Sequence, residues 1–270
     1  REKKPVLKNE AVTGEILPSS AVVIDARAAF EFNLAHVPQS VSLSWLDFTQ
    51  KEPKFQGLLE EDFFQQCRRL ARLGIRPDSQ VIIVGNGLKG QGEEGRLAWN
   101  LSFLGIKNIQ LSLIDQWKTR ASQENVAKTA VEEDSLAKQA LWKPEVDLSL
   151  KITKAVFLKK IKLKNPQLIL IDSRVEKDYL DSSRFNKSPL VSGLELINIP
   201  WKEFITSENQ VATVIKDRLK SIGISEDREI IVLDQEGVSA ALVVFCLRQL
   251  GYAKSSILEG GYSFLLEGGL

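Results

Sequence analysis

The stretch RLARLGIRPDSQVIIV at residues 69–84 reads like RLKSIGISEDREIIVL at residues 218–233. In both stretches a helix-like run ends at a glycine, Gly74 or Gly223, and an aliphatic run follows after a short polar segment. This order is typical of a helix that stops at glycine and leads into a buried strand. Self-similarity between distant segments indicates a repeated structural unit.

Two further pairs of segments support the repeat. The sequence VIDAR at residues 23–27 matches LIDSR at residues 170–174, and LGI at residues 104–106 matches LGY at residues 250–252. All three pairs occur in the same order and at nearly the same separation. We therefore interpret the chain as an internal duplication.

The length of 270 residues suits two domains, because single hydrophobic cores usually stop growing before this size. We expect one domain over residues 1–120 and a second over residues 151–270. Residues 121–150 have the composition of a linker, rich in Ala, Ser, Glu, Lys and Gln. We expect Trp142 to hold this linker against a domain surface.

The first copy alternates between aliphatic runs and helical periodicity. Ala21–Asp25 and Val81–Val84 are expected to form buried parallel strands. Helices are expected over Glu60–Leu73 and Glu94–Leu104. The expected apolar face of the first helix consists of Phe63, Phe64, Cys67, Leu70, Ala71 and Leu73. Alternating strands and helices predict an α/β fold, with a parallel sheet covered by helices on both faces in each domain.

Composition excludes several classes of function. The 36 Lys and Arg residues balance 35 Asp and Glu residues, so no basic surface indicates binding to nucleic acid. No stretch of about 18 apolar residues predicts a membrane span. The two cysteines do not indicate a disulfide framework. The chain begins at Arg1, so the compartment stays open: cytoplasmic, or periplasmic if a signal peptide was removed.

Both copies carry an ordered set of short motifs. In the first copy these are Val22–Arg27, Phe30-Glu31-Phe32, His36-Val37-Pro38 and Leu43-Ser44-Trp45. In the second copy they are Ile171–Arg174, Lys177-Asp178-Tyr179, Asn198–Trp201, Leu247–Tyr252 and Leu258–Tyr262. The His-Val-Pro element has no counterpart in the second copy. The ordered set resembles the rhodanese-like family of sulfurtransferases.

The resemblance implies a cysteine after the fourth strand, which carries sulfur as a persulfide. A thiolate at this place is favoured by backbone N–H groups and a helix N-terminus. In the second copy, Asp234 stands at the cysteine position, and no thiol is present in the loop that follows. That loop consists of Gln235, Glu236, Gly237, Val238 and Ser239. We expect the Asp234 carboxylate to occupy the N–H groups that would otherwise receive an anion.

The corresponding loop of the first copy is rich in glycine and also lacks a nucleophile. Its glycines would let the backbone approach a small anion closely, with lysine and arginine supplying charge. The candidate anion-binding residues are Gly85, Asn86, Gly87, Lys89, Gly90 and Arg96. No metal site or cofactor is indicated by the sequence.

Other candidate residues are expected to be structural. Cys67 and Cys246 lie in apolar helical patterns, where burial raises the pKa of a thiol. His36, the only histidine, is expected to shape a loop. We expect hydrogen-bonded networks at the strand ends from Asp25 with Arg27 and from Asp172 with Arg174.

These features predict a tandem rhodanese-like protein that has lost its persulfide cysteine and acts as a binding or regulatory module. Its partner would be a small sulfur-containing anion or a protein. The alternative is an active thiosulfate or 3-mercaptopyruvate sulfurtransferase whose loop cysteine, modified or omitted, is missing from the sequence as written. The complete absence of methionine keeps this alternative open.

Overall fold

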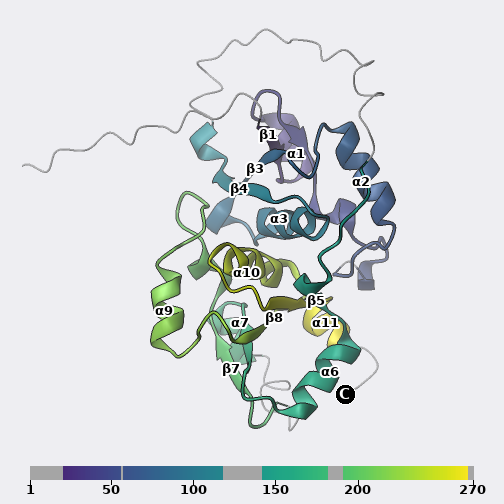
Figure 1. Cartoon of the computed structure of the whole chain (residues 1–270). Coiled ribbons are helices and arrows are strands. Elements are labelled where there is room, and N and C mark those ends of the chain that lie inside the picture. The colour runs from purple at the N-terminus through teal and green to yellow at the C-terminus, as the bar shows by residue number, and fades with distance from the viewer. Residues whose placement is uncertain (1–20, 56, 118–141, 182–190, 267–270) are drawn as a thin grey trace, which may run out of the picture.

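The computed structural model describes residues 21–55, 57–117, 142–181 and 191–266. Within these ranges the chain forms two parallel sheets with helices packed against them (Figure 1). The predicted α/β class and the predicted duplication are therefore confirmed.

The first sheet has the strand order β2-β1-β3-β4, and every neighbouring pair is parallel. Its strands are β1 Val22–Asp25, β2 Val41–Ser42, β3 Gln80–Gly85 and β4 Asn108–Leu113. Its helices are α1 Ala29–Leu34, α2 Phe63–Arg72 and α3 Glu93–Phe103, with 3₁₀ turns at Trp45–Phe48, Pro53–Phe55 and Gly87–Lys89. Apolar side chains of β3 alternate between a large core under α2 and α3 and a smaller cluster that includes Val37 and Trp117.

The second sheet has the order β5-β9-β8-β6-β7, also with parallel pairs. Its strands are β5 Lys151–Ile152, β6 Leu168–Asp172, β7 Glu195–Asn198, β8 Glu229–Leu233 and β9 Ser255–Leu258. Its helices are α6 Lys154–Leu163, α7 Glu176–Asp181, α9 Ile215–Ser221, α10 Val238–Gln249 and α11 Gly261–Leu266, with 3₁₀ turns at Leu148–Leu150 and Trp201–Phe204. Side chains of α9 and α10 join the core on one face of the sheet, and those of α6 and α11 join the core on the other.

The structure corrects one detail of the predicted helix over Glu60–Leu73. Helix α2 begins only at Phe63, because the Asp62 side chain accepts a hydrogen bond from the backbone N–H of Gln65 at 2.9 Å and caps the helix. Phe64 is 53% exposed rather than part of the apolar face. Adjacent helical residues point about 100° apart, so Phe63 packs on the core while Phe64 does not.

The two domains meet along α3 and α10, which lie side by side at the centre of the molecule (Figure 1). Gly95 permits this approach, since a Cβ atom there would lie 2.4 Å from Cβ of Leu242. Trp142 is packed against the first domain, where its Nε1 donates to the carbonyl of Ile75 at 3.2 Å. Most of the expected linker, residues 121–141, lies outside the described residues. The interface places the loop before α3 close to the loop before α10.

Candidate active-site cavity between the domains

The loop between β8 and α10 is closed by the side chain of Asp234. One carboxylate oxygen accepts the backbone N–H of Gly237 at 2.5 Å, and the other accepts the N–H of Ala240 at 3.0 Å and the hydroxyl of Ser239 at 3.1 Å. Gly237, with φ of +86°, provides the left-handed residue that starts the helix. The N–H groups at the start of α10 are therefore bound by the carboxylate of Asp234 itself.

Two opposing effects act on the pKa of the Asp234 carboxyl group. The residue is 3% exposed, and burial raises the pKa of the carboxyl group. The hydrogen bonds from Ala240, Gly237 and Ser239 and the positive charge of Arg96 act in the opposite direction. Asp234 is thus held by the same kind of donors that stabilise an anion at a helix N-terminus.

Arg96 reaches this loop from the other domain. Its Nη1 donates to the carbonyl of Gly237 at 2.7 Å, and its Nη2 donates to the carbonyl of Gly57 at 3.2 Å. The guanidinium lies over the rings of Trp99 and Trp45, at 4.8 and 5.9 Å from their centroids. Burial lowers the pKa of Arg96 to about 10, which leaves it charged at neutral pH. The structure thus brings Arg96 to the second loop, whereas the sequence grouped it with the first.

The glycine-rich loop of the first domain contains a carboxylate of its own. The backbone N–H of Gly87 donates to Oε1 of Glu94 at 2.8 Å, and a Cβ atom on Gly85 would lie 2.6 Å from the carboxyl carbon of Glu94. Burial raises the pKa of Glu94 to about 7. The role of Glu94 was not predicted from the sequence, although an acidic residue in the first turn of a helix after a glycine-rich loop favours such a role.

The other candidates of that loop do not converge on an empty anion site. Nδ2 of Asn86 donates to Oε1 of Glu31 at 3.2 Å, and Lys89 faces Asp115 at 3.4 Å. Gly90 lies beside the carboxylate of Glu93. Asn86, Lys89 and Gly90 therefore each lie beside a carboxylate of the same domain.

A turn of the second domain also packs onto this loop. The carbonyl of Glu208 accepts the backbone N–H of Leu113 at 3.1 Å, and Nδ2 of Asn209 donates to the carbonyl of Ser112 at 3.1 Å. A Cβ atom on Gly87 would lie 3.3 Å from Cβ of Asn209. The first loop is thus covered by the neighbouring domain.

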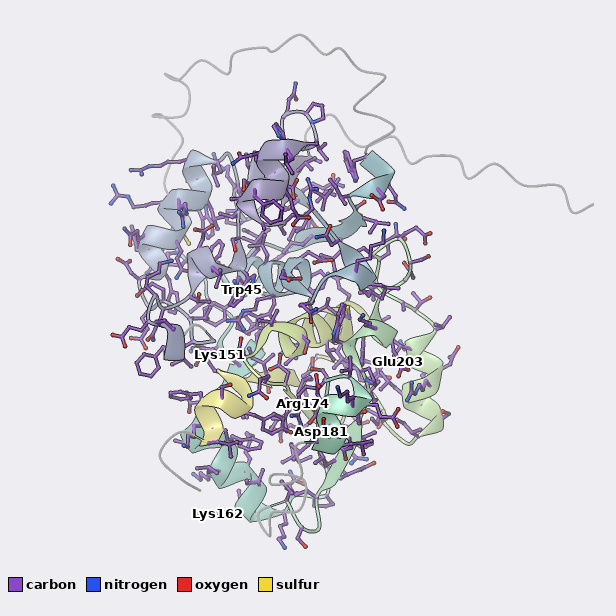
Figure 2. The ribbon with its side chains drawn as sticks, turned by 180° about the vertical axis from the view of Figure 1, so that it is seen from behind. Trp45, Lys151, Lys162, Arg174, Asp181 and Glu203 are labelled. Carbon is purple, nitrogen blue, oxygen red and sulfur yellow. The ribbon has the colours of Figure 1, made fainter. Side chains whose placement is uncertain are left out.

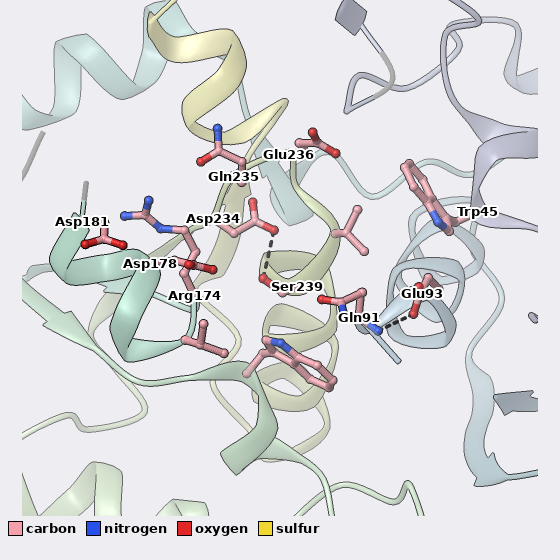
Figure 3. A pocket seen from close by; sticks show the side chains of 13 residues that line it. Trp45, Gln91, Glu93, Arg174, Asp178, Asp181, Asp234, Gln235, Glu236 and Ser239 are labelled. Carbon is pink, nitrogen blue, oxygen red and sulfur yellow. Dashed lines mark hydrogen bonds between the residues drawn. The ribbon is translucent and has the colours of Figure 1, made fainter. Parts of the chain in front are cut away.

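A cavity of about 530 Å³ opens between the domains in front of Asp234 (Figure 3). The first domain contributes Trp45, Gln91 and Glu93, and the second contributes Arg174, Val175, Asp178, Asp181, Trp201, Asp234, Gln235, Glu236, Val238 and Ser239. Figure 2 shows Trp45 on one domain and Arg174 and Asp181 on the other. The cavity lies at the carboxyl ends of β6 and β8, where parallel sheets usually bind ligands.

The two Asp-x-Arg motifs form matching ion pairs at the strand ends. Nη2 of Arg27 lies 2.7 Å from Oδ2 of Asp25, and Nη2 of Arg174 lies 2.6 Å from Oδ2 of Asp172. In the second domain the hydroxyl of Tyr262 also donates to Asp172 at 2.9 Å. The expected internal networks are confirmed.

The remaining candidate side chains are also accounted for. Burial raises the pKa of Cys67 to about 12 and raises that of Cys246 as well. Both thiols lie in the core. The ring of His36 stacks on Phe32, and its Nδ1 lies 2.9 Å from the carbonyl of Phe32, in agreement with a structural role in the loop.

Comparison with known proteins identifies the family. The profile described as "Rhodanese-like domain" matches residues 8–115 and 153–265. The chain belongs to the rhodanese-like domain family. The resemblance read from the sequence is confirmed, and each match corresponds to one of the two sheets. A search of the curated proteins gives no match.

Several solved structures are similar to this chain in fold. SseA of Escherichia coli, a 3-mercaptopyruvate sulfotransferase with the rhodanese fold, aligns with a TM-score of 0.68 and 19% identity, over 90% of this chain and 93% of its own. A protein named "Probable Thiosulfate Sulfurtransferase" aligns with a TM-score of 0.61 and 21% identity, over 94% of this chain and 98% of its own. Tum1 of Saccharomyces cerevisiae aligns with a TM-score of 0.65 and 13% identity, over 93% of this chain and 91% of its own. At these identities the likeness concerns the fold alone.

The rhodanese-like chain has further site residues that the sequence did not single out. Trp45 and Trp201 were quoted as family motifs, and Asp178 as part of another, but none was assigned to a cavity. Their convergence depends on how the two domains pack, which no local pattern reveals.

In the described ranges, no helix is long and apolar enough to cross a membrane.

Proposed function

We propose that this rhodanese-like protein does not transfer sulfur and that it acts as a binding or regulatory module. The proposed domains are residues 1–120 and 151–270, with residues 121–150 as the linker. The observation that carries the proposal is the seat of the Asp234 carboxylate on the N–H groups of Gly237 and Ala240. A carboxylate in that place offers no sulfur atom to hold a persulfide.

The two cysteines of the chain do not compensate for the loss. Cys67 and Cys246 are buried, and burial raises the pKa of both thiols. A protonated thiol is a poor nucleophile, so neither residue offers a route to a persulfide at neutral pH.

The first domain supports the same conclusion. Glu94 binds the N–H of Gly87 in the loop that corresponds to the Asp234 loop. Each domain therefore places one of its own carboxylates where the family would bind an anion. Neither loop has room for thiosulfate or 3-mercaptopyruvate at those N–H groups while the carboxylate is seated.

The test is a sulfurtransferase assay with thiosulfate and cyanide, and a second assay with 3-mercaptopyruvate and a thiol acceptor. The wild-type chain is expected to stay at the background rate with both donors. The comparison variant is Asp234→Cys, whose thiolate would be stabilised by the same N–H groups and should react with iodoacetamide at neutral pH. Turnover by the wild-type chain above background would refute the proposal and favour the active-enzyme alternative.

A further inference from the structure

Acidic side chains outnumber basic ones in the lining of the cavity in front of Asp234. Glu93 enters from the first domain, and Asp181 and Glu236 enter from the second, all around the seat of Asp234 (Figure 3). Asp178 also lines the cavity. Among the described lining residues, Arg174 is the only cation, and it forms an ion pair with Asp172 at 2.6 Å. The lining therefore repels small anions and attracts positive charge.

Two tryptophans form the aromatic part of the lining. Trp45 comes from the first domain and Trp201 from the second. Indole faces attract ammonium and guanidinium groups. Each of these rings already has a cation of the chain nearby: Arg96 lies 5.9 Å from the Trp45 centroid, and Lys202 lies 5.4 Å from the Trp201 centroid.

Trp201 also offers a hydrogen-bond donor. The side chain is only 3% exposed, yet it lines the cavity. In the part of the chain that the structure describes, no acceptor pairs with its indole N–H. Among the described residues, this N–H is not one of the fully enclosed side-chain atoms that lack a partner, so it remains accessible to an acceptor in the cavity.

We infer that the cavity binds an organic cation, a protonated amine or a guanidinium, and not an anionic sulfur donor. The inference rests on the proposed function and gives the ligand class of the same site. Carboxylates supply the opposite charge and Trp45 and Trp201 supply aromatic surface. The N–H of Trp201 is available to an acceptor atom where the ligand also carries one. Within the described residues, no group of three His, Cys, Asp or Glu side chains is arranged to hold a metal ion.

The cation could belong to a free small molecule or to a side chain of a peptide. The two sources are separated by titrating the full chain with n-butylammonium chloride in one arm and Nα-acetyl-lysine methylamide in the other. Sodium thiosulfate is the anionic probe. The readout is the ¹H–¹⁵N spectrum of the indole groups, with the Trp45 and Trp201 signals assigned through Trp→Phe variants.

Both indole signals are expected to shift with at least one cationic probe and to stay in place with thiosulfate. The double variant Asp181→Asn with Glu236→Gln is expected to weaken binding by about five-fold or more, because two carboxylates of the lining lose their charge. The matched control is Asp217→Asn on α9, an exposed carboxylate outside the cavity, which should leave the affinity unchanged. Preference for the lysine derivative would identify a peptide as the source, and preference for butylammonium a small molecule.

The inference is overturned if neither cation shifts the two signals, if thiosulfate shifts them instead, or if the double variant binds as tightly as the wild type. Failure of the proposed function would be observed separately, as sulfur transfer in the sulfurtransferase assay, whether or not the cations bind. A chain that binds no cation and transfers no sulfur would overturn only the ligand class.

Discussion

The buried carboxyl group of Glu94 makes a quantitative prediction about stability. Its pKa is about 7 in the folded chain against an ordinary value of 4.5, chiefly because of burial. Between these pH values the folded chain keeps a proton that the unfolded chain has released. The free energy of unfolding must therefore fall as the pH rises from about 4.5 to about 7. At about 1.4 kcal/mol per pKa unit, the full cost above pH 7 is about 3 kcal/mol.

The variant Glu94→Gln removes this cost while keeping the shape of the side chain. Its amide oxygen can still accept the N–H of Gly87. We expect the variant to be more stable than the wild type by about 2 kcal/mol at pH 8. At pH 5 the gain should shrink to less than about 1 kcal/mol.

The assay is urea unfolding followed by tryptophan fluorescence, at pH 5 and at pH 8. Glu61→Gln is the control, because Glu61 is exposed and its loss should change stability by no more than about 0.5 kcal/mol at either pH. A gain for Glu94→Gln that is the same at both pH values, or absent at pH 8, would refute the reasoning.

Three further predictions concern the interface, the turn and the thiols. Arg96→Met should lower the free energy of unfolding by about 3 kcal/mol, since the buried carbonyl of Gly237 and the partly buried carbonyl of Gly57 lose their donor, and urea unfolding measures the change. Gly237→Ala should lower the free energy of unfolding by about 1 kcal/mol more than Gly223→Ala does. Both glycines have positive φ, but only at Gly237 does the new methyl group lie 3.1 Å from the guanidinium of Arg96. Equal costs in thermal unfolding would show that the contact is harmless. Cys67 and Cys246 should react with Ellman's reagent only after unfolding in guanidinium chloride, and a fast reaction of the native chain would contradict their burial.

Local sequence patterns predicted most of the helices and strands. The strands around Asp25 and Val84 and the helix that ends before Gly74 follow from periodicity and turn chemistry, which act over a few residues. Phe64 was wrongly predicted to lie on the buried face of the helix. The predicted face had six apolar residues, which is more than one face of a helix of this length can bury. Sequence patterns also could not fix where the first turn of each helix begins, since capping by Asp62 decides it.

The candidate site was only partly predictable. Asp234 could be found because the resemblance to the family marks the residue after Leu233 as the cysteine position. Arg96 was grouped with the first loop because it is close to it in sequence, while its actual partner is Gly237, in the other domain. The two cavity tryptophans were missed for the same reason, because their roles arise from packing between domains. Glu94 acts within its own domain, where it accepts the N–H of Gly87.

The central claim is that no sulfur atom is carried at the turn after Leu233. Trypsin should release residues 229–248 as one peptide, cut after Arg228 and after Arg248, that contains both Asp234 and Cys246. The direct measurement is the mass and fragmentation of this peptide after the full chain has been treated with thiosulfate. We predict the mass of the unmodified sequence, with an aspartate at position 234. A cysteine at that position, or the mass of one additional sulfur atom on the peptide, would contradict the account.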